Sequence, residues 1–154
     1  MKRIFSILCT VLLMFSTACG ADTAEAEPVN AETVYRSLSD HMENVSPQSS
    51  ELTARLIGLQ EEDIIDAYSS FASDQGAQLL VVVETVDEAT ALKASERLNY
   101  YLATLQNSAS QYAPDQLALL NEGYIYTNDN IAVLIVSPTA SEAKQELASL
   151  FHGS

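Results

Sequence analysis

Histidine is the side chain most often used for acid–base or metal chemistry near neutral pH, and the chain contains two, His41 and His152. A catalytic or metal-binding histidine normally has a partner at a defined spacing, as in H-E-x-x-H. Neither histidine has such a neighbour, and the sequence contains no G-x-S-x-G, P-loop or G-x-G-x-x-G motif. The pattern predicts surface histidines, no bound metal or cofactor, and no recognisable catalytic centre.

Carboxylates offer a second kind of chemistry, and the densest group is Glu61-Glu62-Asp63 with Asp66. Several carboxylate oxygens on a fixed loop can bind Ca²⁺, but the D-x-[DN]-x-[DN]-G pattern of calcium loops is missing. We therefore expect the cluster to be a solvated turn. Asn128-Asp129-Asn130 is also expected to be a turn without metal, because hairpin turns favour these residues for their backbone conformation.

Two tyrosines, Tyr124 and Tyr126, share one face of a predicted strand. A tyrosine ring offers an apolar body and a hydroxyl that can form hydrogen bonds, which suits a binding surface. The pair is a candidate binding surface for a sugar or a peptide. The alternative is that the two rings cover the flank of the sheet.

The chain is strongly acidic, with 7 Lys and Arg against 21 Asp and Glu and a formal net charge of −14. Lys2 and Arg3 are the only charged residues among the first 18, so the chain without those residues would carry −16. Such a surface repels nucleic acid and anionic lipid headgroups, and we expect neither as a main partner. The acidity could attract Ca²⁺ or a cationic partner; the simpler interpretation is a solvated surface that resists aggregation.

Residues 1–18 have the features of an export signal, with positive charge at Met1-Lys2-Arg3 and an apolar run, Ile4–Phe15, that is too short to span a membrane. Ser16-Thr17-Ala18-Cys19 follows and resembles the lipobox of bacterial lipoproteins, which usually has leucine where Ser16 stands. The resemblance implies cleavage after residue 18 and a diacylglycerol on Cys19, which consumes its thiol. Ala24-Glu25-Ala26 is an alternative cleavage site that would give ordinary secretion.

Residues 19–30 are small and acidic and contain Pro28, a composition that predicts a flexible tether. Cys9 and Cys19 are the only cysteines, so no disulfide can link the residues that follow. We divide the remainder into an N-terminal helix and linker at 31–50 and a folded domain at 51–152.

The folded part alternates between helical and strand-like patterns. Helices are predicted at 31–45, 87–111, 115–121 and from Ser137 to Phe151. The longest of them has a continuous apolar stripe that includes Tyr101 and Tyr112. Strands are predicted at 64–72, 78–83, 123–126 and 131–136. The domain is thus an α+β domain with the order β-β-α-β-β-α.

Two of the strands, Leu79–Val83 and Ile131–Val136, are apolar on both faces and belong at the centre of a sheet. A four-stranded antiparallel sheet in the order 1-2-4-3 meets this condition, with the long helix crossing from the second strand to the third. We expect the two later helices to cover one face. The helix 31–45 would then lie loosely on the other face and leave a docking surface; the alternative is a closed three-layer domain in which residues 31–59 cover that face.

Three segments together resemble a family of short lipoprotein domains of Gram-positive bacteria that is catalogued as a domain of unknown function. They are the strand Leu79–Val83, the helix ending in Gln111-Tyr112-Ala113-Pro114, and the hairpin that leads to Ile131–Val136. The resemblance covers about Glu51–Phe151. It implies a location outside the cytoplasm and supplies no catalytic motif.

These features predict a non-catalytic binding or accessory module of the cell envelope. We expect the lipid on Cys19 to hold it on the extracytoplasmic side of the cell membrane, with another envelope protein as a candidate partner. The alternative is an envelope hydrolase whose site is built from carboxylates such as Glu61, Asp63 and Glu84.

Overall fold

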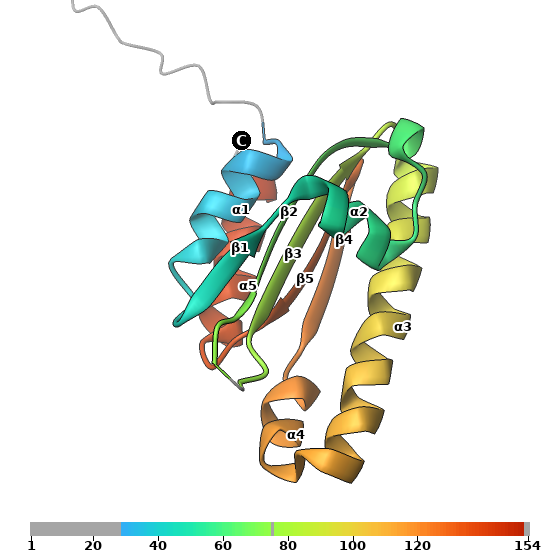
Figure 1. The fold of residues 1–154 in the computed structure, drawn as a ribbon. Helices are drawn as coiled ribbons and strands as arrows, with labels where there is room; N and C mark the ends of the chain where they lie inside the picture. Colours follow the sequence, from blue (N-terminus) through green and yellow to red (C-terminus); the bar gives the residue numbers. More distant parts are fainter. Residues whose placement is uncertain (1–28, 75, 153–154) are drawn as a thin grey trace, which may run out of the picture.

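The computed structural model describes residues 29–74 and 76–152, so Cys19 and the rest of the predicted signal and tether up to residue 28 lie outside the described residues. Strands form one sheet with helices on both faces (Figure 1). In chain order the elements are α1 (Ala31–Ser39), β1 (Val45–Gln48), α2 (Ser50–Ile57), a short 3₁₀ helix η1 (Glu61–Asp63), β2 (Ile64–Ala72), β3 (Leu79–Thr85), α3 (Glu88–Tyr112), α4 (Pro114–Asn121), β4 (Tyr124–Asn128), β5 (Ile131–Val136) and α5 (Ala140–His152).

The strands lie in the order β1-β2-β3-β5-β4, and every neighbouring pair is antiparallel. The four predicted strands are β2, β3, β4 and β5, and their predicted order is confirmed within this sheet. As predicted, α3 crosses from β3 to β4, with β5 between these two strands. The prediction of four strands was wrong, because a fifth strand, β1, pairs with the outer edge of β2 from Val45 opposite Ala72 to Gln48 opposite Ser69.

The missed strand occupies residues assigned to the end of the first helix and the linker after it. α1 ends at Ser39, although its apolar stripe had predicted a helix to Val45. Asn44, directly before β1, has a φ of 53°, in the left-handed region, a conformation that a helix continuing to Val45 would not contain. Pro47 lacks an N–H group to donate, which suits an edge strand. β1 is therefore short and mostly polar, and it lacks the alternating apolar pattern from which strands are predicted.

Central strands pack against a helical layer on each side of the sheet. Leu79, Val81 and Val83 face the cluster formed by α2, α3 and α4. Leu80 and Val82 face the opposite cluster, formed by α1 and α5. The prediction that the two later helices share one face was therefore wrong, since α3 and α5 lie on opposite faces (Figure 1). Strands that are apolar on both sides need cover on both sides.

No loose docking surface is left under α1. Val34 and Leu38 are 0% exposed, and the strand residues beneath them are buried as well. The closed three-layer domain is thus the correct alternative, but its second face is covered by α1 together with α5. α2 lies within residues 31–59, which this alternative placed on that face, but it packs on the other face through Ile57.

Polar contacts join α1 to α5 at the edge of this layer. The Glu146 carboxylate accepts a hydrogen bond from the Ser37 hydroxyl, and its Oε2 lies 2.9 Å from Nε2 of His41. His41, expected at the surface, is instead half-buried against this carboxylate. The hydrogen bonds from Ser37 and His41 hold the pKa of Glu146 below its usual value.

This lowered pKa predicts a pH-dependent contribution to stability. Because the folded-state pKa of Glu146 lies below the unfolded value of about 4.3, its contribution is complete above that pH and is lost as the pH falls through the folded-state pKa. Glu146→Gln should lower the free energy of unfolding at pH 6 but much less at pH 3, as measured by urea denaturation. Glu96→Gln, an exposed carboxylate on α3, serves as the control. A Glu146→Gln effect equal at both pH values would contradict the assignment.

Candidate ligand-binding cavity

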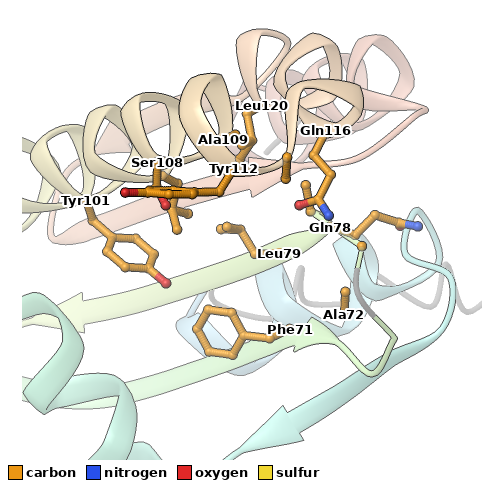
Figure 2. Close-up of a pocket in the computed structure, with 14 residues that line it drawn as sticks. Phe71, Ala72, Gln78, Leu79, Tyr101, Ser108, Ala109, Tyr112, Gln116 and Leu120 are labelled. Atoms are coloured by element: carbon orange, nitrogen blue, oxygen red, sulfur yellow. The ribbon is translucent and has the colours of Figure 1, made fainter.

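A cavity of about 210 Å³ lies beside the end of the sheet where β2 ends and β3 begins. Figure 2 shows side chains of α3 and α4 on one side of it, and Phe71 and Leu79 of the sheet on the other. α3 contributes Tyr101, Ser108 and Tyr112. The cavity is therefore a space between the sheet and the C-terminal half of the longest helix.

The spacing of residues along α3 explains why these side chains share one space. Tyr101, Leu105, Ser108 and Tyr112 follow one another at i, i+4, i+7 and i+11, which places them on one face of a helix. The Asp87 side chain caps the helix by accepting from the Thr90 N–H group. The predicted break at Ala113-Pro114 is confirmed, and Pro114 begins α4. α4 then brings Gln116 to the cavity.

None of the residues that line the cavity is charged. Three aromatic rings, from Phe71, Tyr101 and Tyr112, lie among aliphatic groups, and the polar side chains are amides and hydroxyls. The Tyr101 hydroxyl, like that of any tyrosine of ordinary pKa, is protonated at neutral pH and can donate a hydrogen bond. Burial raises the pKa of Tyr101 further. Tyr112 is 82% exposed, which leaves most of its ring open to a ligand. The arrangement can hold a small group against aromatic rings.

Sequence reasoning missed this site because Tyr101 and Tyr112 fitted the apolar stripe of a core-facing helix. That interpretation is wrong for Tyr112, which is mostly exposed. The signal that could have revealed the cavity is the pair of tyrosines, with Ser108 between them, where a core-facing stripe would hold aliphatic residues.

The predicted tyrosine pair lies elsewhere, on the face of β4 that meets α5. Tyr124 and Tyr126 are half-buried, with ring centroids 6.3 Å apart. The ring centroids of Tyr126 and Phe151 are 5.4 Å apart. Nζ of Lys144 lies 4.6 Å from the centroid of the Tyr124 ring. In this position the pair fills the junction between β4 and α5.

The carboxylates proposed for a hydrolase do not line one common cavity. Glu61 lines a separate cavity of about 230 Å³ together with Glu51 and Asp66. Glu84 accepts a 2.9 Å hydrogen bond from the N–H group of Ala31 at the start of α1. Asp66 accepts a 2.7 Å hydrogen bond from the Tyr68 hydroxyl, which raises the pKa of Tyr68 to about 12.

Within residues 29–74 and 76–152, no group of three or more His, Cys, Asp or Glu side chains is placed to hold a metal ion. In the same part of the chain, no helix has both the length and the apolar character needed to cross a membrane.

The predicted turn between β4 and β5 is confirmed, and Asp129 in it has a φ of 47°. Because Asn adopts this left-handed conformation as readily as Asp, Asp129→Asn should change the free energy of unfolding by less than about 0.5 kcal/mol. The melting temperature should be the same with and without millimolar Ca²⁺. A calcium-dependent rise in wild-type melting temperature that disappears in Asp129→Asn would show a metal site instead.

The sheet, its two helical layers and the cavity define a small α+β domain. Residues 38–137, which extend from the end of α1 to the residue after β5, match the model of a family described as a domain of unknown function (DUF4358), and the chain belongs to this family. Neither a curated protein nor a solved structure matches the chain significantly. The match starts before the predicted domain boundary at residue 51 and includes β1.

Proposed function

We propose that this protein is a lipid-anchored lipoprotein on the extracytoplasmic side of a Gram-positive cell membrane, and that its domain is a non-catalytic binding module. The cavity between Tyr101 and Tyr112 is its ligand site. The observation that carries the proposal is the composition of the cavity wall, which is aromatic and aliphatic with a few amide and hydroxyl groups. Small-molecule sites in proteins usually have this composition.

The size of the cavity narrows the ligand to one small group. Sites for drug-sized molecules enclose about 300–1,000 Å³, whereas this cavity has about 210 Å³. It therefore suits a single ring or a head group of similar size. The residues that line it include no carboxylate, histidine, cysteine or lysine, so binding is favoured over acid–base or nucleophilic catalysis there.

The position of the cavity agrees with an anchored binding module. Val29 and Asn30, which precede α1, lie near the end of the sheet where Ala31 binds Glu84. The cavity lies at the other end of β3, beside Leu79. Glu84 and Leu79 are five residues apart along the strand, which corresponds to a distance of about 17 Å. A lipid on Cys19 would thus be joined to the domain at the end opposite to its ligand site, so the attachment leaves that site accessible.

Cys19→Ala should release the protein from the membrane fraction or leave it unprocessed. Two acyl chains anchor stably because each buried methylene contributes about 0.8 kcal/mol, and the variant has no thiol to carry them. Cell fractionation and the mass of the mature N-terminus measure both effects, with Cys9→Ala as the control. Recovery of wild-type protein that begins at Glu27 would show that the alternative cleavage site is used.

Ligand binding in the cavity is tested by blocking it with a large side chain. Ser108 lines the cavity and is exposed, so Ser108→Trp should fill or cover the space without disturbing the core. Asn107→Trp is the matched control, because Asn107 is an exposed neighbour on α3 that does not line the cavity.

Full-length lipoprotein in detergent is incubated with a small-molecule extract of the cell envelope, washed, and heated, and the released compounds are identified by mass spectrometry. At least one compound should be retained by wild type and Asn107→Trp but not by Ser108→Trp. Retention of the same compounds by all three proteins would contradict the proposed site.

A further inference from the structure

Three acidic residues are bonded to or adjoin described residues that line the cavity, although no carboxylate of the described residues lines it. Asp74 Oδ1 accepts a 2.9 Å hydrogen bond from the N–H group of Gly76, a lining residue. The N–H group of Glu43 donates to the side chain of Gln78, which also lines the cavity. Asp115 directly precedes Gln116 on α4. All three are exposed.

The Asp74 carboxylate, which is bonded to lining residue Gly76, and the large excess of acidic residues in the chain make the surroundings of the cavity electrostatically negative. Among the residues that the structure describes, no lysine or arginine lines the cavity, and the chain as a whole has a net charge of −14. Clustered charge of one sign raises the local concentration of the opposite ion and accelerates its encounter. Cations are therefore drawn to this opening and anions are repelled from it.

Inside the cavity, however, a strongly hydrated cation would find no ligands. Ca²⁺ and Mg²⁺ require several oxygen ligands, typically including carboxylates, and no carboxylate lines the space. The rings of Phe71, Tyr101 and Tyr112 can instead attract a cation through their negative π faces. Aromatic surroundings favour quaternary ammonium groups, whose methyl groups also pack on aliphatic side chains such as Leu79 and Leu105.

We infer that the cavity binds a small organic cation with a methylated ammonium head group. This inference rests on the proposed function, because it assigns a chemical class to the ligand of the same site. The Asp74 carboxylate and the negative net charge of the chain attract the positive charge, and the aromatic rings hold the methylated head after it has lost its water. A neutral ring of similar size would gain only the second of these interactions.

The test compares choline with 3,3-dimethylbutan-1-ol, in which carbon replaces the charged nitrogen at the same size and shape. Binding to the full-length lipoprotein in detergent is measured by isothermal titration calorimetry. Choline should bind at least about tenfold more tightly than the alcohol. Its affinity should fall as sodium chloride is raised, because salt screens the exposed Asp74 and the net negative charge of the chain.

The tyrosine variants test the location. Tyr112→Leu should weaken choline binding about three- to tenfold, the range expected for one partly exposed cation–π contact, whereas Tyr112→Phe keeps the ring and should bind like wild type. Tyr112 is mostly exposed, so these variants should fold normally. Tyr100→Leu is the matched control, since Tyr100 is 78% exposed on the same helix and does not line the cavity.

Different failures separate this inference from the proposed function. Equal binding of choline and the alcohol would overturn the requirement for charge. Absence of choline binding, with an envelope compound retained in a Ser108-dependent manner, would overturn the cationic ligand and support the binding module. If neither occurs, both proposals fail. Phosphatidylcholine vesicles should not bind, because Asp74 and the net negative charge of the chain repel the lipid phosphate. Vesicle binding that is lost in Tyr112→Leu would show that the ligand is a lipid head group and would overturn a free small cation.

Discussion

Deletion of residues 31–46 is expected to abolish cooperative folding. The deleted residues include all of α1, whose buried side chains are Ala31, Val34 and Leu38. Burial of one Val or Leu side chain contributes about 1.5–3 kcal/mol, and the deletion also exposes the strand residues beneath. Since the total stability of a domain is about 5–15 kcal/mol, the loss should exceed what the remaining contacts can offset. Circular dichroism during thermal denaturation measures the effect.

Deletion of residues 20–27 is the control for a shortened chain, because these residues precede the described part of the structure. That variant should unfold at the wild-type temperature. A folded product from the 31–46 deletion would contradict the closed three-layer domain and would restore the possibility of an open sheet face beneath α1.

Leu98→Ala should lower the free energy of unfolding by about 2–5 kcal/mol, the range measured for large-to-small changes in protein cores. Leu98 is fully buried between α3 and the sheet, in the cluster that contains Val81 and Val83. Substitution with alanine would leave a cavity in the layer that positions Tyr101. Urea denaturation measures the loss.

The matched control for this core substitution is Leu92→Ala. Leu92 lies on the same helix but is 53% exposed, and its truncation should change stability by less than about 0.5 kcal/mol. Equal effects of the two substitutions would show that α3 does not bury the face that contains Leu98.

Much of the sheet could be predicted because its strands carry strong local patterns. Leu79–Val83 and Ile131–Val136 are apolar on both faces, which predicted that both lie at the centre of the sheet. The turn residues at 128–130 predicted that Ile131–Val136 pairs with β4. β1 could not be recognised from the same kind of signal, because its four residues, Val45–Gln48, are mostly polar and include proline. Its position depends on pairing with β2 rather than on its own sequence.

The side of the sheet that each helix covers was beyond the reach of periodicity. An apolar stripe shows that a helix is buried on one side, but it does not say which face of the sheet receives it. α3 and α5 therefore looked equivalent in the sequence, yet they pack on opposite faces.

The cavity has a similar origin in tertiary packing. α2 has only 8 residues, and a 2.7 Å contact between the hydroxyls of Thr53 and Ser69 fixes it on β2. Phe71, two residues farther along β2, lies beside the cavity. No residue of α2 lines the cavity, whose limits depend on how the sheet packs with α3 and α4, and this packing leaves little trace in the sequence of the lining residues.

The pairing of α1 with α5 has a consequence for how the protein is made. The contact between Ser37 and Glu146 joins residues 109 positions apart, so the layer over Leu80 and Val82 is incomplete until α5 has been synthesised. Chains that depend on such distant contacts form them late, and their apolar strands are exposed to aggregation meanwhile. Folding of this domain should therefore follow translation rather than accompany it.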